Sequence, residues 1–390
     1  MTHLHSDVLS ALHRIAPDFA DVAAAHDRSG DFPESNARKL HEAGILGLAA
    51  PRDLGGKEAD LPTALAVVQS IARDDPSSAL VLTMTWLTLR GFGERAEWPE
   101  HLRRRIVADV LDNGALVNSL RVEPDLGTPA RGGLPATIAR RDGDQWRISG
   151  RKIFSTGSTA LTWMLVWARN DDDDPKVGSF LVHRSAPGIR IEPTWDHLGM
   201  RATVSHDVIF EDVPTPLDHA LDLRPLAHVR SFSPEFAAWG STLVPAIYDA
   251  VAQSARDWFV GWANNRVPSN LGAPVSSLYR FQEGIGSVDA LLLSNRVLLQ
   301  AAARGELGAT ELPLLKYLVT ENAISVVERL VALSGNPGLS RSNPLERYHR
   351  DVLCGRIHTP QADVALGGSG RAAFSAAANK PVEPIGVAVP

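Results

Sequence analysis

The feature that most constrains the fold of this chain is a double change in its hydrophobic periodicity. Near the N-terminus, the segment from Val8 to Val22 carries apolar residues three and four positions apart, which is typical of an amphipathic helix. Between about residues 115 and 220, short alternating or β-branched runs separated by turn residues predict strands. Three long segments rich in alanine and leucine then predict helices again: 236–265, 278–303 and 311–334. Helices, then strands, then helices favour segregated layers over an alternating βαβ fold.

These changes divide the chain into consecutive parts and give an α+β fold with several domains. We predict an N-terminal helical domain, a central β domain, a C-terminal helical domain and a mobile tail, with the bounds 1–114, 115–222, 223–378 and 379–390. The tail contains three prolines. Within the first domain, Asp31–Pro33 is expected to open one helix and Asp74–Ser77 to end another.

The composition argues against several classes of function. A formal net charge of −6 gives no general attraction for nucleic acid or anionic membranes. The single cysteine, Cys354, excludes an internal disulfide and fits a reducing cytosol. The sequence has no CxxC pair, no HExxH motif and no His/Cys cluster, so we predict no metal site. The run Asp171–Asp174 is interpreted as a solvated hairpin loop, because a calcium loop needs glycine and a distal Glu at set positions.

The chain also lacks the usual membrane signals. No basic segment followed by an apolar run stands at its start, and no apolar stretch approaches the roughly 20 residues that span a bilayer. We therefore expect a cytoplasmic protein with neither nucleic acid nor membrane among its partners.

Two stretches in the first half carry glycine-rich motifs. Gly44–Leu48 precedes Pro51 and Leu54–Gly56, and alone this pattern could be any glycine-rich end of a helix. Residues 122–128 read Val-Glu-Pro-Asp-Leu-Gly-Thr, which alone could be a Pro-Asp turn followed by glycine.

Two further stretches follow in the β region and near the C-terminus. Residues 150–157 read Gly-Arg-Lys-Ile-Phe-Ser-Thr-Gly, in which Lys152 and Thr156 could be ordinary exposed strand residues. The last stretch is in pieces: Leu198–Arg201 (Leu-Gly-Met-Arg) with Val208–Pro214, and then Leu345–Asp351.

Together these stretches resemble the acyl-CoA dehydrogenase family, in its order and at its separations, from residue 40 to residue 371. The resemblance implies a central β-barrel or sandwich and a C-terminal four-helix bundle. It also implies one FAD per subunit and assembly into a homodimer or homotetramer. FMN in place of FAD stays an alternative, because the residues expected near the adenosine half match the family least well.

The resemblance assigns five residues to the flavin ring and its phosphate. Val122 replaces the usual Thr but keeps its backbone N–H, and Thr128 keeps a hydroxyl that reaches phosphate in the family. Phe154 stands where Trp is usual and retains part of the stacking area. Ser155 belongs to the same cofactor-binding edge, and the hydroxyl of Thr156 corresponds to one aimed at flavin N5, where it tunes the flavin electronics.

A second group is assigned to the remainder of the cofactor. Arg266 follows a long helix and matches an arginine that crosses to the partner subunit's FAD pyrophosphate, although alone it could simply oppose the helix dipole. Gln282 and Asn336 lie near family positions for the adenosine half of FAD. Gln361 is also assigned to cofactor binding by the resemblance.

The catalytic base of the family is missing from both of its usual positions. In the family's reaction, a carboxylate removes the α proton of an acyl thioester while a hydride leaves the β carbon for flavin N5. Counting along the motifs places that carboxylate at Thr359 or, in some relatives, at Gly240. Neither residue can act as a base, and Glu235 lies a turn or more away from Gly240.

His358 directly precedes the first empty position. This arrangement resembles a branch of the superfamily that uses reduced flavin and oxygen as monooxygenases, in which a histidine assists the reaction with oxygen. The ordinary pKa of histidine suits proton transfer near neutrality, so we predict His358 as the catalytic residue. A second histidine expected near Thr85 in parts of that branch is missing, and His358 could instead be a structural loop residue.

Three functions are compatible with these residues; we predict the first, and the other two are alternatives. The first is an FAD-dependent dehydrogenase acting on the CH–CH group of an acyl-CoA or carrier-bound acyl thioester, with an atypical base and an electron-accepting flavoprotein as partner. The second is a monooxygenase that uses O2 and receives reduced flavin from a flavin reductase. The third is a flavin-binding paralogue without catalytic activity.

Overall fold

The computed structural model describes residues 2–95, 97–126, 133–229 and 233–378, so the predicted tail at 379–390 lies outside the described residues. The N-terminal part is helical, as its periodicity predicts. The helices are α1 (Thr2–Ser29), α2 (Glu34–Glu42), α3 (Leu61–Asp74), α4 (Pro76–Glu94) and α5 (Glu100–Asn113). Gly114 closes α5 with a left-handed φ of 69°, a conformation that glycine adopts without steric cost.

Helix α4 is an addition to the predicted helices. The segment Asp74–Ser77 ends α3, as expected, but it also begins α4 because Asp75 caps the new helix. The Asp75 carboxylate accepts hydrogen bonds from the backbone N–H groups of Ser77 at 3.0 Å and Ser78 at 3.2 Å. Pro76 occupies the first helical position, where its missing N–H costs nothing. A stop signal and a start signal therefore coincide in this segment.

The central part forms one mixed sheet in the order β6-β7-β3-β2-β4-β5-β8, with β1 paired to β4. Its strands are β1 (Leu116–Leu120), β2 (Ile138–Asp142), β3 (Gln145–Lys152), β4 (Leu161–Asn170), β5 (Lys176–His183), β6 (Ile189–Glu192), β7 (Asp207–Pro216) and β8 (Ala220–Pro225). These strands occupy the region from about 115 to 220 in which the alternating runs predict them. Strand β8 ends three residues beyond the expected domain boundary at 222.

The sheet curls, because β5 contacts β7 although the two strands are not neighbours in it. Trp146 on β3 and Phe180 on β5 meet edge to face across the inside, with ring centroids 5.5 Å apart. The acidic run Asp171–Asp174 joins the antiparallel strands β4 and β5, so its interpretation as a hairpin loop is confirmed.

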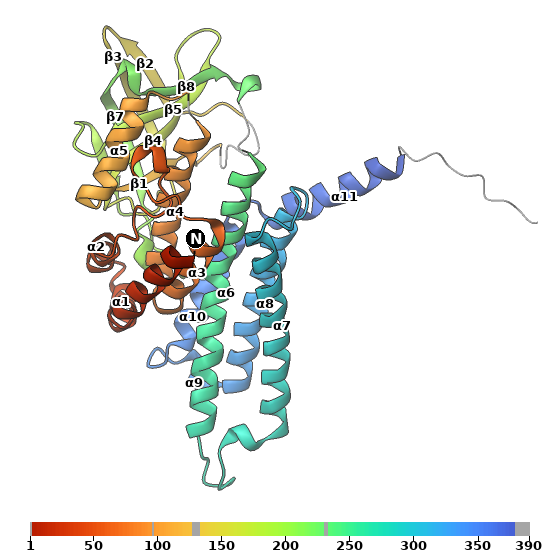
Figure 1. Ribbon diagram of the computed structural model, residues 1–390. Coiled ribbons are helices and arrows are strands. Elements are labelled where there is room, and N and C mark those ends of the chain that lie inside the picture. Colours follow the sequence, from red (N-terminus) through yellow and green to blue (C-terminus); the bar gives the residue numbers. More distant parts are fainter. Residues whose placement is uncertain (1, 96, 127–132, 230–232, 379–390) are drawn as a thin grey trace, which may run out of the picture.

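The C-terminal part is a helical bundle in which α6 (Pro234–Asn265), α7 (Tyr279–Ala303), α8 (Leu312–Ser334) and α10 (Leu345–Leu353) pack together (Figure 1). The short α9 (Asn336–Leu339) precedes α10, and α11 (Ala362–Ala378) projects away from the bundle (Figure 1). Helix α6 has 32 residues and is therefore roughly 48 Å long. One end of α6 lies beside the β domain and the other lies at the far end of the bundle (Figure 1).

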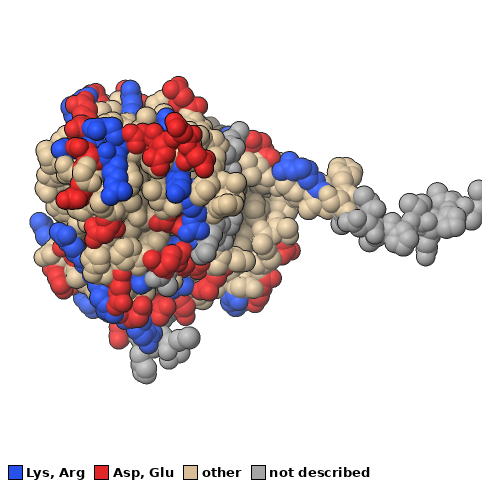
Figure 2. All heavy atoms as spheres, turned by 90° about the horizontal axis from the view of Figure 1, so that it is seen from above, with Lys and Arg blue, Asp and Glu red and all other residues tan. Residues whose placement is uncertain are grey.

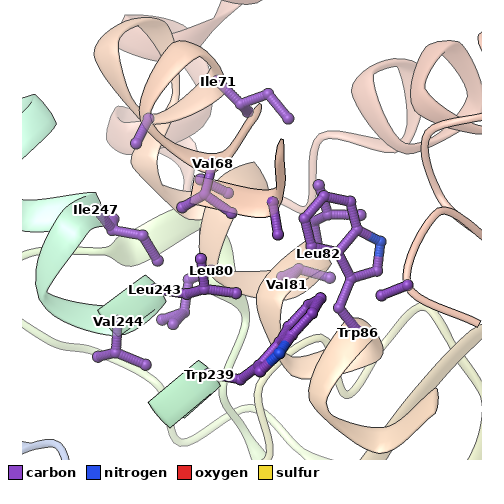
Figure 3. Close-up of a cluster of buried hydrophobic side chains, with 14 of the residues drawn as sticks. Val68, Ile71, Leu80, Val81, Leu82, Trp86, Trp239, Leu243, Val244 and Ile247 are labelled. Carbon is purple, nitrogen blue, oxygen red and sulfur yellow. The ribbon is translucent and has the colours of Figure 1, made fainter. Parts of the chain in front are cut away.

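The N-terminal helices and the bundle share one core. Val68 of α3, Leu80 and Trp86 of α4, and Trp239 and Leu243 of α6 are all buried and gather at the junction of these helices (Figure 3). Burial of such large side chains stabilises the junction by about 1.5–3 kcal/mol per residue. This shared core fixes α4 against α6 and, through α4, against the β domain.

The surface in Figure 2 carries basic and acidic side chains side by side rather than a continuous basic face. Among the described residues, no helix is both long and apolar enough to cross a membrane. The same residues contain no group of three or more His, Cys, Asp or Glu side chains that could hold a metal ion.

Candidate functional site

The turn that follows β3 carries three of the predicted site residues. Phe154 adopts a left-handed φ of 54°, which is unusual for a residue with a side chain, and its ring remains 51% exposed. Two aromatic rings stand beside it: Trp195 and His197 stack on one another with centroids 3.6 Å apart, and both meet the ring of Phe154 edge to face. This aromatic group forms an open apolar wall at the turn.

Backbone hydrogen bonds hold the turn against the loop between β6 and β7. The N–H of Ser155 donates to the carbonyl of His206 at 3.2 Å, and the N–H of Gly157 donates to that of Thr203 at 2.8 Å. The hydroxyl of Thr156 accepts a hydrogen bond from Ser205 Oγ at 3.1 Å. Because that oxygen already accepts, the Thr156 hydroxyl proton can donate to a group outside the turn.

Strand β1 and the segment that follows it brace the same turn. The side-chain amide of Asn118 donates to the carbonyl of Thr156 at 3.0 Å. The carbonyl of Val122 accepts from the N–H of Ile153 at 3.0 Å, which brings the second motif against the third. Thr128, the predicted phosphate-binding hydroxyl, lies outside the described residues.

A buried ion pair lies beneath both motifs. Lys152 Nζ donates to Glu123 Oε1 at 2.6 Å and to the carbonyl of Trp167, and both charged side chains are almost completely inaccessible to solvent. Glu123 also accepts from the backbone N–H groups of Ala136 and Thr137 and from the Thr137 hydroxyl. The alternative interpretation of Lys152 as an exposed strand residue is therefore wrong, because the glutamate of the preceding motif draws it inward.

For both Lys152 and Glu123, burial and ion pairing shift the pKa in opposite directions. Burial lowers the pKa of Lys152 to about 8, although Glu123 acts to raise it. Burial acts to raise the pKa of Glu123, but the hydrogen bonds from Lys152, Thr137 and the Ala136 N–H lower it below its ordinary value. Both groups are charged at neutral pH.

The Leu198–Arg201 motif connects the β domain to the bundle. Gly199 lies so close to α10 that a Cβ atom there would come within 2.3 Å of the Arg350 carbonyl. The N–H of Met200 donates to the buried carboxylate of Asp351 at 2.6 Å. Met200 and Val204 both have left-handed φ values, 53° and 42°. Strained backbone of this kind commonly occurs at functional sites.

His358 follows α10 and the 3₁₀ turn η7 (Cys354–Ile357), seven residues after Asp351. Its Nε2 lies 2.6 Å from the hydroxyl of Tyr248, which is fully buried on α6. The ammonium group of Lys316, also buried, donates to the Gly355 carbonyl at 2.9 Å in the same turn. The Tyr248–His358 hydrogen bond is therefore the main polar contact of the imidazole.

The prediction that His358 titrates near neutrality is corrected by its surroundings. Burial and, to a smaller extent, the positive charge of Lys316 together lower the pKa of His358 to about 4. Burial raises the pKa of Tyr248 well above its ordinary value. At pH 7 both partners are therefore neutral, and the imidazole carries one N–H donor and one acceptor nitrogen.

The described residues offer no carboxylate at the two usual base positions. Thr359 is exposed, and a Cβ atom at Gly240 would meet nothing within 4 Å. Glu235 is exposed and lies 2.8 Å from Arg90. Thr85, near the position of the missing second histidine, is buried, and its hydroxyl accepts from the N–H of Val117 at 3.4 Å.

The remaining predicted residues lie apart from the turn. Arg266 is exposed and caps the far end of α6, and its carbonyl accepts from the N–H of Val275. Gln282 lines a nearby cavity of about 150 Å³ and donates to the carbonyls of Ser276 and Ser277. Asn336 is exposed at the start of α9, while the half-buried Gln361 donates to the Ile357 carbonyl at 3.3 Å beside the His358 loop.

Four contributions were not predicted: the Glu123–Lys152 pair, Asn118, the Trp195–His197 stack and Tyr248. Glu123 and Lys152 both lie inside the motifs of the sequence analysis, so the presence of two opposite charges there could have indicated the ion pair. Tyr248 gave no signal, because 110 residues separate it from His358.

The turn has the features that a flavin requires. The Oγ atom of Ser155 is buried and has no hydrogen-bond partner in the described structure, while the Phe154 ring is half exposed beside the Trp195–His197 stack. A polar atom without a partner and an uncovered aromatic wall, next to the free donor of Thr156, fit a planar ring with polar edges.

Comparison with known proteins agrees with this geometry. Family models of the acyl-CoA dehydrogenase N-terminal, middle and C-terminal domains match residues 5–102, 122–213 and 250–361. The chain belongs to the acyl-CoA dehydrogenase family, and it is a flavin-dependent oxidoreductase.

Individual relatives fall into two functional groups. The chain is 35% identical to "Putative acyl-CoA dehydrogenase YdbM" of Bacillus subtilis, over 92% of this chain and 94% of that protein. It is 29% identical to the L-evernosamine nitrososynthase of a Micromonospora species, over 92% and 87%. Among solved structures, KijD3 in complex with FMN and a dTDP-linked amino-keto sugar is 26% identical, with a TM-score of 0.79 over 97% of this chain and 95% of that one.

Proposed function

We propose that this protein is a flavin-dependent monooxygenase that uses reduced flavin and O2 to place one oxygen atom on a nitrogen or sulfur atom of a small substrate. The observation that carries the proposal is the neutral His358 bonded to Tyr248, in the loop where the family's dehydrogenases carry a glutamate. A conjugate acid with a pKa of about 4 makes this imidazole a poor base for an α proton, but the neutral ring can hold and orient a hydrogen-bonding partner.

Two of the relatives support the same conclusion. A nitrososynthase oxidises nitrogen, as its name states, and it matches most of this chain. The structure of KijD3 holds FMN together with an amino sugar, so a related chain accommodates a nitrogen-bearing substrate beside a flavin. FAD and FMN are both compatible with the residues around the turn, and we expect reduced flavin to come from a separate flavin reductase.

When bound, the reduced flavin supplies two electrons, so that one atom of O2 joins the substrate and the other leaves as water. Val122, Phe154, Ser155 and Thr156 would hold the ring. Tyr248 fixes the orientation of His358, which keeps one ring nitrogen free to donate or accept a proton. The aromatic wall formed by Phe154 and Trp195 would cover one side of the ring.

A dehydrogenase acting on an acyl thioester is the second candidate, favoured by the 35% identity to YdbM. In that case His358 would have to be the base, and an electron-accepting flavoprotein would reoxidise the flavin. Acyl-CoA or a carrier-bound acyl group would then be the substrate.

Two spectroscopic experiments separate the candidates. In the first, the flavin-loaded protein is mixed anaerobically with a panel of acyl-CoA thioesters, and bleaching near 450 nm is recorded. In the second, the protein receives a flavin reductase, NADH and O2 with amine or sulfide substrates, and oxygenated product is measured by mass spectrometry with ¹⁸O2. The proposal requires no bleaching and incorporation of one labelled atom, whereas bleaching without incorporation would overturn it. If neither reaction occurs, the non-catalytic alternative is supported.

A gain-of-function variant sharpens the test. Thr359→Glu places a carboxylate at the family position, and we expect it to allow bleaching by acyl-CoA that the parent lacks. Thr359→Gln is the matched control, because it has nearly the same shape without the charge.

The quaternary arrangement is also part of the proposal. Arg266 lies at the far end of α6 from the β domain, so one subunit does not surround a single cofactor with all of its predicted ligands (Figure 1). A homodimer or homotetramer in which Arg266 reaches the partner's cofactor accounts for its exposure. Light scattering of the holoprotein and flavin titration of Arg266→Ala test this: a monomer with unchanged flavin affinity in the variant would contradict it.

A further inference from the structure

Arg121 is a partly buried cation, with a buried Nε atom, that the reaction scheme does not use. It follows β1 directly and precedes Val122, and its guanidinium lies over the indole of Trp167, 4.7 Å from the ring centroid. The pairing of Leu120 with Val166 places the two residues side by side on the sheet.

The donors of this pair lack acceptors. Arg121 Nε is buried and has no hydrogen-bond partner within the described structure. Trp167 is only 7% exposed, and its Nε1 is likewise buried and unpaired there. Buried donors without partners are rare in folded proteins, and two adjacent ones indicate an acceptor that the described residues do not supply.

Arg121 also lies among other basic side chains. Arg95 is buried and lies close enough for its charge to lower the pKa of Arg121, with burial as the larger cause. Arg121 in turn acts to lower the pKa of Lys152. The nearby carboxylate, Glu123, already accepts from Lys152, from Thr137 twice and from the Ala136 N–H. Three basic groups, Arg95, Arg121 and Lys152, therefore lie close enough to influence one another.

We propose that Arg121 and Trp167 form a binding site for an oxyanion, a carboxylate, sulfonate or phosphate group carried by the substrate. An arginine stacked on an aromatic ring keeps the edge of its guanidinium free, and that planar edge grips an oxyanion with two parallel N–H groups. The indole N–H of Trp167 offers a third donor. Assigning the oxyanion to the substrate rests on the proposed function, because Val122, the next residue, belongs to the segment expected at the flavin.

Binding is tested first without any reaction. Thermal unfolding of the flavin-loaded protein is followed with acetate, methanesulfonate or inorganic phosphate replacing chloride at constant ionic strength. We expect at least one of these anions to raise Tm by several degrees in the parent protein and to quench tryptophan fluorescence. In Arg121→Met, both effects should vanish, while Arg141→Met, which removes an exposed arginine from β2 of the same domain, should behave like the parent.

The variant is also expected to fold. Since Arg121 lies among cations, Arg121→Met should have a Tm without added anion that is equal to or higher than that of the parent. Equal responses to the anions in the parent and in Arg121→Met would overturn the proposal.

Two further titrations distinguish an oxyanion of the substrate from the phosphate of the flavin. If the site belongs to the substrate, Arg121→Met raises the KM for an anionic substrate at least tenfold and leaves the KM for a neutral analogue unchanged. The variant then also binds FMN and riboflavin with the same affinities as the parent protein. If the variant loses affinity for FMN but not for riboflavin, the site holds the flavin phosphate and the proposal is wrong. Binding of the probe anions can succeed even if the monooxygenase assignment fails, so the two hypotheses are distinguishable.

Discussion

The turn after β3 and the loop around His358 differ from the family's usual residues in different ways. The turn differs from the family in side chains, with Phe154 for Trp and Val122 for Thr, but its contacts are made largely by backbone groups and by one buried ion pair. The His358 loop carries its chemistry in single side chains, and there the glutamate is missing and a neutral imidazole stands one residue earlier. Contacts made by backbone groups survive a change of side chain, whereas chemistry that depends on a single side chain is lost with it.

The largest expected effect tests the His358 loop. His358→Gln removes the imidazole that would donate or accept a proton, so product formation should fall by about 10²-fold, the low end for a positioned acid or base, because its pKa of about 4 lies far from neutrality. Flavin affinity should stay unchanged, because the turn is held by other residues. Product is measured by mass spectrometry and flavin binding by fluorescence. His228→Gln, an exposed histidine, is the control. If His358→Gln instead lost flavin affinity and kept its rate, the two regions would not have the separate roles proposed for them.

Substitutions beneath the turn should change the stability of the protein rather than its reaction rate. Lys152→Met leaves the buried Glu123 carboxylate without its cation, which should cost about 3–5 kcal/mol of unfolding free energy in urea denaturation. The double variant Glu123→Gln with Lys152→Met should recover a large part of that loss, since no uncompensated charge remains. If Lys152→Met is as stable as Arg140→Met, an exposed control on β2, the ion pair does not support the turn.

Acid should act on the His358 loop before it acts on the turn. The folded-state pKa of His358, about 4, lies below its ordinary value of 6.5. The unfolded chain therefore takes up this proton first, and stability is lost as pH falls from about 6.5 toward 4, by about 2–3 kcal/mol. Urea denaturation at successive pH values should show a shallower decline in His358→Gln than in the parent. Parallel curves would mean that the imidazole is not desolvated.

The smallest effect concerns the positioning of His358. Tyr248→Phe removes one neutral hydrogen bond and should lower the rate about tenfold, corresponding to about 1–1.5 kcal/mol. The acid limb of the rate profile should shift as well, a change that packing alone would not cause. An unaltered pH profile would show that Tyr248 only fills space.

Local pattern was enough for a large part of the fold. The bounds of α6, α7 and α8 and several strands follow from periodicity, and the motifs located the turn and the His358 loop in sequence. Helix α4 was missed because Asp75 both follows one helix and caps the next, and local signals do not rank these two roles. The alternative interpretation of Lys152 as an exposed residue is wrong because its partner Glu123 lies 29 residues earlier, beyond the reach of local patterns.

The sequence by itself determined the family, the order of helical and β parts, and the absence of a carboxylate at positions 240 and 359, since residue identity and spacing along the chain are local properties. Only the tertiary structure decided the protonation of His358 and the isolation of Arg121. A pKa and an unpaired donor depend on burial and on neighbours that come together from distant segments, and the free energy of transferring a charge from water to the interior is set by that assembly rather than by the residue alone.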